Sequence, residues 1–270
     1  MHPDLRTHEG FESLAGFDEV TFKSYINNKL QGCDKHIDFI KKNLIDDRYK
    51  GHVLEFGSGN GKLLFRLEKE GMLEQGVGYD LSESRNKFTK KFGESLGSKK
   101  VTSIHGDFLS IDPSSHKFDL LIGVDIVTQL IPPVSGDAER NLFNAIKNTL
   151  KNGGWLLLEL QEFANIINMA QLAGGVLRQW KEFHESDPWR YGLDAFSVQG
   201  RDIKWKKTFI HRTSLAKTSS STEILRAYTR DEIRELLTGI GLSDVRFYDH
   251  WQEPGDVDSG EYIVVARNKG

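Results

Sequence analysis

Short apolar runs alternate with stretches of helical spacing along most of this chain. Five runs have the length of strands and fall at residues 53–56, 76–80, 101–105, 118–124 and 155–160. Between them, apolar residues recur three and four positions apart, as at Leu63, Leu64 and Leu67, which is typical of helices with one buried face. Strands that alternate with helices predict a doubly wound α/β fold, in which helices cover both faces of a mostly parallel sheet.

The two ends of the chain add further elements to this pattern. Apolar residues at helical spacing predict a helix over residues 34–45, ahead of the first strand. Near the C-terminus, the capping box that starts at Thr229 precedes a helix that stops at a glycine. Apolar runs at 245–248 and 262–266 then predict an antiparallel pair of strands that closes the sheet.

The segment 163–228 is longer than a simple connection between strands requires, and it holds three of the five tryptophans. A helix is expected from residue 163 to about 183, interrupted by two glycines, and the alternation over 203–211 predicts a half-exposed strand. The serine-rich stretch 218–222 reads as a flexible turn, from which 223–228 returns as the partner strand. Most of the aromatic residues here are expected to form a small core, while a few line a pocket.

Composition and charge exclude several classes of protein. The 270 residues carry a net charge of −3 and no strongly basic stretch, which argues against a duplex nucleic acid as partner. Cys33 is the single cysteine, so no internal disulfide forms. No apolar run reaches the roughly 20 residues that a membrane-spanning helix needs, and the N-terminus has no secretory signal pattern. We therefore expect a soluble, cytoplasmic protein without a membrane partner.

A glycine-rich turn separates the first strand from the first helix of the alternating pattern. Gly57, Gly59 and Gly61 permit positive φ angles and let backbone N–H groups approach a ligand closely. The helix that follows offers unpaired donors and the positive end of its dipole. A dinucleotide fingerprint would place its third glycine at position 62, where this chain has Lys62.

With Glu55 two residues ahead of the first glycine, this turn resembles the first motif of the class I S-adenosylmethionine (AdoMet)-dependent methyltransferases. The resemblance implies a Rossmann-like sheet of seven strands with an antiparallel last strand. It divides the chain into an N-terminal helical cap (1–50), a cofactor-binding core (51–162), a substrate lid (163–228) and a closing helix and hairpin (229–270). It also implies that AdoMet is the cofactor. Its expected contacts in and near the turn are Glu55, Gly57, Ser58, Gly59 and Gly61.

The second strand ends in Asp80, which lies 19 residues after Gly61. A carboxylate in this place is suited to accept hydrogen bonds from two ribose hydroxyls. The alternative is that Asp80 caps the next helix, but Ser82 can supply that cap itself. Leu81 is expected beside the same ligand.

Other cofactor contacts follow from the resemblance. The family places an acidic residue at the adenine amino group and the next residue beside the ring, which Asp107 and Phe108 match, although a Gly-Asp pair also makes an ordinary turn. Val124 ends the fourth strand and is assigned to the cofactor site. In the family a tyrosine of the cap sometimes touches the cofactor; Tyr25 is a candidate, and the alternative is that it packs the cap on the core.

The sequence also predicts the acceptor side of the site. Gln129 stands where many members of the family carry histidine, so it joins Trp189 and Trp205 as an expected substrate contact. If the nucleophile is protonated, a general base is needed, and the candidates are Asp125, Glu162, His211 and His250. No metal is expected.

The predicted reaction is methyl transfer to a nitrogen or oxygen of a small molecule. A protein or RNA methyltransferase and a non-catalytic AdoMet-binding module are the alternatives. The identity of the acceptor and the oligomeric state stay open.

Overall fold

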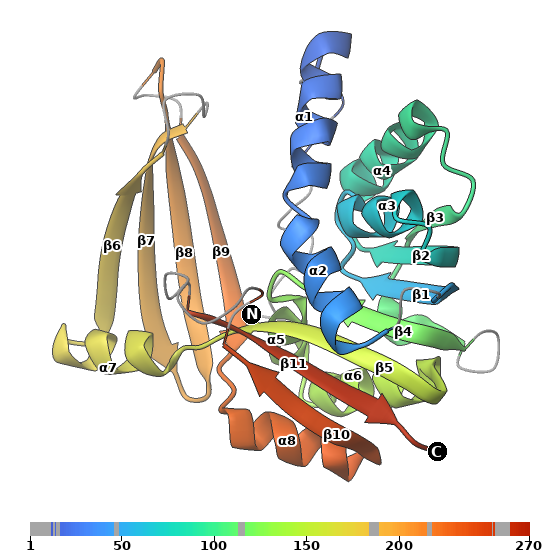
Figure 1. Ribbon diagram of the computed structural model, residues 1–270. Coiled ribbons are helices and arrows are strands. Elements are labelled where there is room, and N and C mark those ends of the chain that lie inside the picture. The colour runs from blue at the N-terminus through green and yellow to red at the C-terminus, as the bar shows by residue number, and fades with distance from the viewer. Residues whose placement is uncertain are drawn as a thin grey trace.

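Two β-sheets build the structure (Figure 1). The computed structural model describes residues 12, 14, 17–45, 49–112, 117–183, 189–214, 218–249, 251 and 260–270. The larger sheet contains β1 (Gly51–Phe56), β2 (Leu73–Asp80), β3 (Val101–His105), β4 (Phe118–Gly123), β5 (Leu150–Gln161), β10 (Leu242–Tyr248) and β11 (Glu261–Asn268). Their spatial order is β10-β11-β5-β4-β1-β2-β3, and β11 runs antiparallel to both of its neighbours. The predicted seven-stranded, mostly parallel fold with an antiparallel last strand is confirmed.

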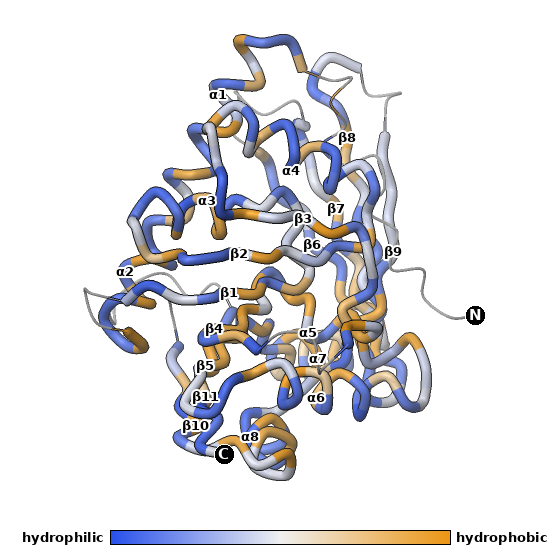
Figure 2. Tube along the Cα trace, turned by 90° about the vertical axis from the view of Figure 1, so that its right-hand side faces the viewer, coloured by the Kyte–Doolittle hydropathy of each residue, from blue (hydrophilic) through white to orange (hydrophobic). Residues whose placement is uncertain are grey.

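Helices cover both faces of this core sheet because its central strands are apolar on both sides. In β4, Leu120 and Ile122 pack against α2 (Asp34–Asn43) and α3 (Lys62–Lys69), whereas Leu121 faces α6 (Ala138–Thr149) and α8 (Arg230–Gly239). Figure 2 shows the hydrophobic residues gathered along these strands, with hydrophilic residues alternating on the outer helices. Within the described residues, no helix is long and apolar enough to cross a bilayer.

The N-terminal cap contains a helix that the spacing analysis did not predict. The helix α1 (Glu19–Gln31) begins with a capping box between Asp18 and Thr21. Its buried Phe22 packs on Phe88 of α4 (Glu83–Leu96), beside the core sheet. The predicted helix over 34–45 is present as α2 and ends two residues earlier.

The segment 163–228 folds differently from the prediction in its first half. The helix α7 (Ala164–Leu172) ends before Gly174 and Gly175, whose φ angles of 76° and 100° are left-handed and stop the helix. The chain then enters β6 (Val176–Glu182) where more helix was expected. β6 is the edge strand of the second sheet and pairs only with β7 there. The spacing of its apolar residues, which resembled that of a helix, therefore did not predict the strand.

This second sheet, the lid sheet, is antiparallel with the order β6-β7-β8-β9. Its other strands are β7 (Trp189–Gln199), β8 (Asp202–His211) and β9 (Thr218–Arg226). The serine-rich stretch predicted as a turn lies inside β9, where it pairs with β8 along its whole length. The predicted pairing of the alternating strand with a returning strand is therefore confirmed, with a longer partner.

A buried glutamine joins the lid sheet to the core sheet. Gln129 lies in the short helix α5 (Val127–Leu130) and has no exposed surface. Its side-chain amide donates to the carbonyls of Gln161 in β5 and Arg226 in β9, both at 3.1 Å. Its carbonyl accepts the N–H of Gln161 at 2.7 Å. Two 3-10 turns, η3 (Phe108–Ser110) and η4 (Pro132–Val134), complete the described elements.

We expect Gln129→Met to destabilise the protein by about 1–3 kcal/mol, because buried backbone groups lose their partners while the side chain keeps its volume. Urea unfolding measures the change. Gln179→Met, at an exposed position of β6, is the control and should change stability by less than about 0.5 kcal/mol. Equal stability of the two variants would show that Gln129 does not hold the sheets together.

Candidate active site

One cavity of about 440 Å³ extends from the glycine turn to the lid sheet. Its first half lies at the carboxyl ends of β1, β2 and β4, which is where ligands bind in open α/β sheets. Its second half is bounded by α5 on one side and by Trp205, Lys207 and Glu223 of the lid sheet on the other. The segments that form the cavity are therefore far apart in the sequence.

The glycine turn has the backbone shape that the sequence predicted. Gly57, Gly59 and Gly61 have φ angles of 65°, 55° and 72°, in the left-handed region. A Cβ at Gly57 would lie 2.4 Å from a methyl group of Val127, and one at Gly59 would meet only the flexible end of Arg85. Side chains are thus excluded at Gly57 by packing, whereas the space beside Gly59 belongs to the cavity.

Asp80 fastens this turn to the end of β2. One carboxylate oxygen accepts the N–H of Gly59 at 2.8 Å, and the other accepts the N–H of Ser82 at 2.8 Å. Ser82 caps α4 with its own side chain by accepting from Arg85, as the sequence predicted. The carboxylate of Asp80 lines the cavity and keeps lone pairs for further donors.

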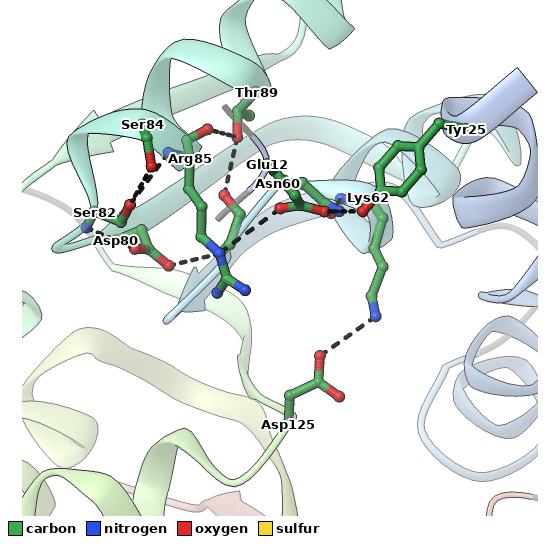
Figure 3. Close-up of polar contacts among 11 residues, drawn as sticks. Glu12, Tyr25, Asn60, Lys62, Asp80, Ser82, Ser84, Arg85, Thr89 and Asp125 are labelled. Carbon is green, nitrogen blue, oxygen red and sulfur yellow. Dashed lines mark hydrogen bonds and ion pairs between the residues drawn. The ribbon is translucent and has the colours of Figure 1, made fainter. Parts of the chain in front are cut away.

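A polar cluster from the cap closes the side of the turn (Figure 3). Glu12 accepts hydrogen bonds from Tyr25 and from Asn60, which lies in the turn itself, and it forms an ion pair with Arg85. Tyr25 also packs on Phe88, so it stands behind Glu12 and is not among the residues that line the cavity. The guanidinium of Arg85 and the ammonium of Lys62 point toward the open centre of the view.

Residues expected near the adenine also line the cavity. Asp107 and Leu81 line the cavity, and Asp107 also accepts the N–H of Leu109. Phe108 stacks on Phe56 with ring centroids 4.7 Å apart, so one edge of a core aromatic pair reaches the cavity. Val124 is buried and does not line it.

Two buried polar groups beneath the turn have no hydrogen-bond partner within the described structure. These are one carboxylate oxygen of Glu55 and the hydroxyl of Ser58, and both residues line the cavity. Burial raises the pKa of Glu55 from an ordinary 4.5 to about 8, with Lys62 acting in the opposite direction. Unpartnered groups of this kind are costly in a closed core, so they indicate a place for a polar ligand.

The end of β4 is strained and held by a buried carboxyl group. Asp125 and Ile126 have φ angles of 56° and 62°, which non-glycine residues adopt at a cost of about 1–3 kcal/mol each. Glu159 accepts the N–H of Asp125 at 2.7 Å and the indole N–H of Trp251 at 2.5 Å. Burial, together with the charge of Asp125, raises the pKa of Glu159 to about 7.

This strained turn directs the side chain of Asp125 into the cavity, where it pairs with Lys62 at 3.3 Å. Burial acts to lower the pKa of Lys62, but Asp125 and the other acidic neighbours raise it above its ordinary value. Lys62 begins α3, so the pair bridges the turn after β1 and the turn after β4. Of the three candidate bases that the structure describes, Asp125 is the one that lines the cavity with the glycine turn.

The other candidates for the acceptor side are spread apart. Trp205 lines the cavity, whereas Trp189 packs with Phe209 and His211 further along the lid sheet. Glu162 forms an ion pair with Arg230 outside the cavity. Gln129 is buried between the two sheets, as described above, and His250 lies outside the described residues.

Comparison with known proteins identifies the fold and the domain. Residues 53–154 match the family described as "Methyltransferase domain". An S-adenosylmethionine-dependent methyltransferase from Clostridium acetobutylicum superposes with a TM-score of 0.71 at 19% identity, covering 92% of this chain and 98% of that one. Residues 53–154 therefore match a methyltransferase domain, and the fold is that of the class I AdoMet-dependent methyltransferases. The cofactor of that family is AdoMet.

Two further similarities are to a methyltransferase of known structure and to a peptide synthetase. CalS10, an amino pentose methyltransferase from Micromonospora echinaspora, matches with a TM-score of 0.65 and 16% identity over 93% of this chain and 98% of its own. Cyclosporin synthetase simA from Tolypocladium inflatum is 41% identical over 60 residues. That match spans 22% of this chain and, to the nearest percent, 0% of the synthetase.

The residues present fit the methyltransferase cofactor. AdoMet carries an ammonium group, a carboxylate, two ribose hydroxyls and an adenine. Glu55 and Asp80 would serve as acceptors for the ammonium and the ribose, and the N-terminus of α3 with Lys62 would offer donors for the carboxylate. Among the described residues no group of three or more acidic, histidine or cysteine side chains is placed to hold a metal.

Several residues of this site were not predicted from the sequence. Glu12, Arg85, Lys207 and Glu223 line the cavity, yet each lies in a segment that shows no motif. Glu159 gave a usable signal, because a lone carboxyl residue interrupts an otherwise apolar central strand. The other four are brought to the cavity by packing between segments that are distant in the sequence.

The raised pKa of Glu55 predicts a pH dependence of stability. The folded state binds a proton that the unfolded state releases near pH 4.5, so stability contributed by this group is lost as the pH rises from about 4.5 to about 8. Glu55→Gln removes the titration. Its stability relative to the unaltered protein should therefore rise with pH in this window, by up to about 1.4 kcal/mol per pH unit.

Chemical unfolding of the ligand-free proteins at pH 5, 6.5 and 8 measures this difference. Glu74→Gln, at an exposed position of β2, is the control and should follow the unaltered protein at every pH. A difference for Glu55→Gln that does not change with pH would mean that Glu55 is ionised throughout the range.

Proposed function

We propose that the protein binds AdoMet in the half of the cavity beside the glycine turn and transfers its methyl group to a nitrogen or oxygen of a small molecule. The observation that carries this proposal is the continuity of the cavity. It joins the glycine turn, with Asp80 and Glu55, to the aromatic and charged face of the lid sheet. The acceptor occupies the half between α5 and the lid sheet.

In the cofactor half, each residue group has a distinct task. Asp80 holds the ribose hydroxyls while its hydrogen bond to Gly59 keeps the turn open. Glu55 accepts from the ammonium of the methionine part, which provides the partner that its buried oxygen lacks. Asp107 and Phe108 lie where the adenine binds. Gly57, Gly59 and Gly61 bring the backbone close to the ligand.

Methyl transfer requires mainly that the acceptor is aligned with the cofactor and that water is kept out of the site. The bound cofactor supplies a methyl group that is already activated by its sulfonium, so alignment of the acceptor provides much of the rate. Ile126, directly before α5, and Leu130 in α5 form an apolar wall beside the acceptor and limit the access of water. Asp125 is the residue placed to accept a proton from the acceptor, with Lys62 holding its carboxylate in the cavity.

The binding proposal is tested by filling the space beside Gly59. Gly59→Val should abolish AdoMet binding in calorimetry, because its side chain enters the cavity where the ligand lies. Gly97→Val is the matched control, since Gly97 has a similar φ of 66° and nothing within 4 Å of a Cβ. Both variants bear the same backbone strain of about 1–3 kcal/mol, but only the first should lose the cofactor.

Normal AdoMet affinity in Gly59→Val would remove the turn from the site. Tight binding of NADH by the unaltered protein would overturn the methyltransferase proposal as a whole.

The transfer proposal is tested with labelled AdoMet and fractionated metabolite extracts. We expect label in small-molecule fractions, and Asp125→Asn should reduce the rate about 100-fold while AdoMet affinity changes less than about threefold. Asp137→Asn, at an exposed position before α6, is the control and should leave the rate unchanged. Label only in protein or RNA would show that the acceptor is a macromolecule and not a small molecule. No label in any fraction would favour a non-catalytic AdoMet-binding module.

A further inference from the structure

The acceptor half of the cavity contains a charged arrangement that the reaction itself does not explain. In the lid sheet, one face packs toward α7 and α5, and we call it the inner face. Its apolar part is buried against these helices. On the same face, the register places four further residues next to one another across β7, β8 and β9. They are Asp194, Trp205, Lys207 and Glu223.

These four side chains form a connected site. The indole N–H of Trp205 donates to Asp194 at 2.9 Å, which fixes the orientation of the ring. The ammonium of Lys207 lies over that ring, 3.8 Å from its centroid, and donates to Glu223 at 2.7 Å. The side chain of Glu223 is 2% exposed and that of Lys207 is 17% exposed. The pair is therefore withdrawn from solvent and faces the cavity.

An aromatic face next to a buried carboxylate is a site for an ammonium group. The face of a tryptophan ring is electron-rich and attracts cations, most strongly where water is excluded. The carboxylate of Glu223 adds a charge-assisted hydrogen bond. Lys207 shows that the site accepts this chemistry, because its own ammonium occupies the position at the end of a flexible four-carbon chain.

The balance of charge over the whole cavity also favours a cation. More acidic than basic side chains line it: the acidic residues are Glu12, Glu55, Asp80, Asp107, Asp125, Glu223 and Glu261, and the basic residues are Lys29, Lys62, Arg85 and Lys207. Across from the lid sheet, Ile126 and Leu130 offer an apolar wall. The space thus suits a molecule with an apolar body and a positively charged amino group.

We propose that the acceptor is an amine, and that its amino group binds on the face of Trp205 beside Glu223 in the place that Lys207 now fills. This inference rests on the proposed methyl transfer for its context, since it names the acceptor class of the same cavity. Lys207 then acts as a competitor that the substrate displaces. The strength with which Lys207 binds Trp205 and Glu223 sets how well the site discriminates amines from neutral compounds.

Three probes with one ring and different charges test this assignment by calorimetry: benzylamine, benzyl alcohol and benzoate. Lys207→Met should bind benzylamine about tenfold or more tightly than the unaltered protein, because a buried Glu223 without its lysine gains an external partner. Benzyl alcohol should bind equally well to both proteins. Lys206→Met is the matched control, since Lys206 is exposed on the opposite face of β8, and it should change nothing.

A second variant keeps the test decisive if loss of the Lys207–Glu223 pair weakens folding. Lys207→Met combined with Glu223→Gln leaves no buried charge, and it should fold while losing the gain in benzylamine affinity. Unchanged benzylamine binding in folded Lys207→Met would overturn the proposal. Tighter binding of benzoate than of benzylamine by the unaltered protein would also overturn it, and would make Lys207 an anchor for an acidic acceptor.

The same proteins are titrated with AdoMet to separate the two proposals. Failure of the unaltered protein to bind AdoMet would contradict the proposed function, whereas the amine probes report on the lid sheet without the cofactor. AdoMet affinity that stays within about threefold in Lys207→Met, together with the gain for benzylamine, supports the amine site specifically.

Discussion

The hydrogen bond from the N–H of Gly59 to Asp80 is the interaction on which the cofactor half of this structure depends. A turn with three left-handed glycines is flexible, so its shape must be fixed from outside. Asp80 fixes it from the end of the neighbouring strand and directs its remaining lone pairs into the cavity. The same carboxylate thereby shapes the backbone and presents an acceptor for a ligand.

A comparable arrangement holds the turn after β4, with a carboxyl group in a less favourable setting. Glu159 is buried in a central strand and secures the strained backbone at Asp125. Its pKa, raised to about 7 by burial, reflects the cost of keeping a charge in the core. The strained backbone places the carboxylate of Asp125 opposite Lys62 in the cavity, and this ion pair offsets part of the cost. The turn is thus less stable locally, but it holds the side chain of Asp125 in position.

The lid sheet contributes a wall that the core sheet does not possess. It is attached through Gln129, which bonds to β5 and β9, and through Arg226, which pairs with Asp202 and Glu139. These buried and half-buried contacts hold the lid sheet at the end of the core, where its inner face closes the acceptor half of the cavity. Trp205 is thereby brought to the same cavity as the glycine turn.

The sequence by itself determined the elements whose signals are local. Alternating strands and helices gave the core sheet, the spacing from the glycine turn located Asp80, and Ser82 was recognised as the cap of α4. Each of these depends on residues within one or two elements, because backbone conformation and helix capping are decided by near neighbours. Reliance on local signals also explains why β6 was wrongly predicted as helix. The helical spacing of its residues was given more weight than the two glycines that end α7.

Only the tertiary structure decided which side chains meet in the cavity. Lys207 and Glu223 are neighbours because β8 pairs with β9 in one register, and a shift of β9 by one residue would turn Glu223 to the opposite face from Lys207. Glu12 and Arg85 meet because the cap packs on α4, and Gln129 is buried because α5 lies between two sheets. Such contacts arise because distant segments bury apolar surface against one another. The polar residues that meet in this way show no periodic pattern in the sequence.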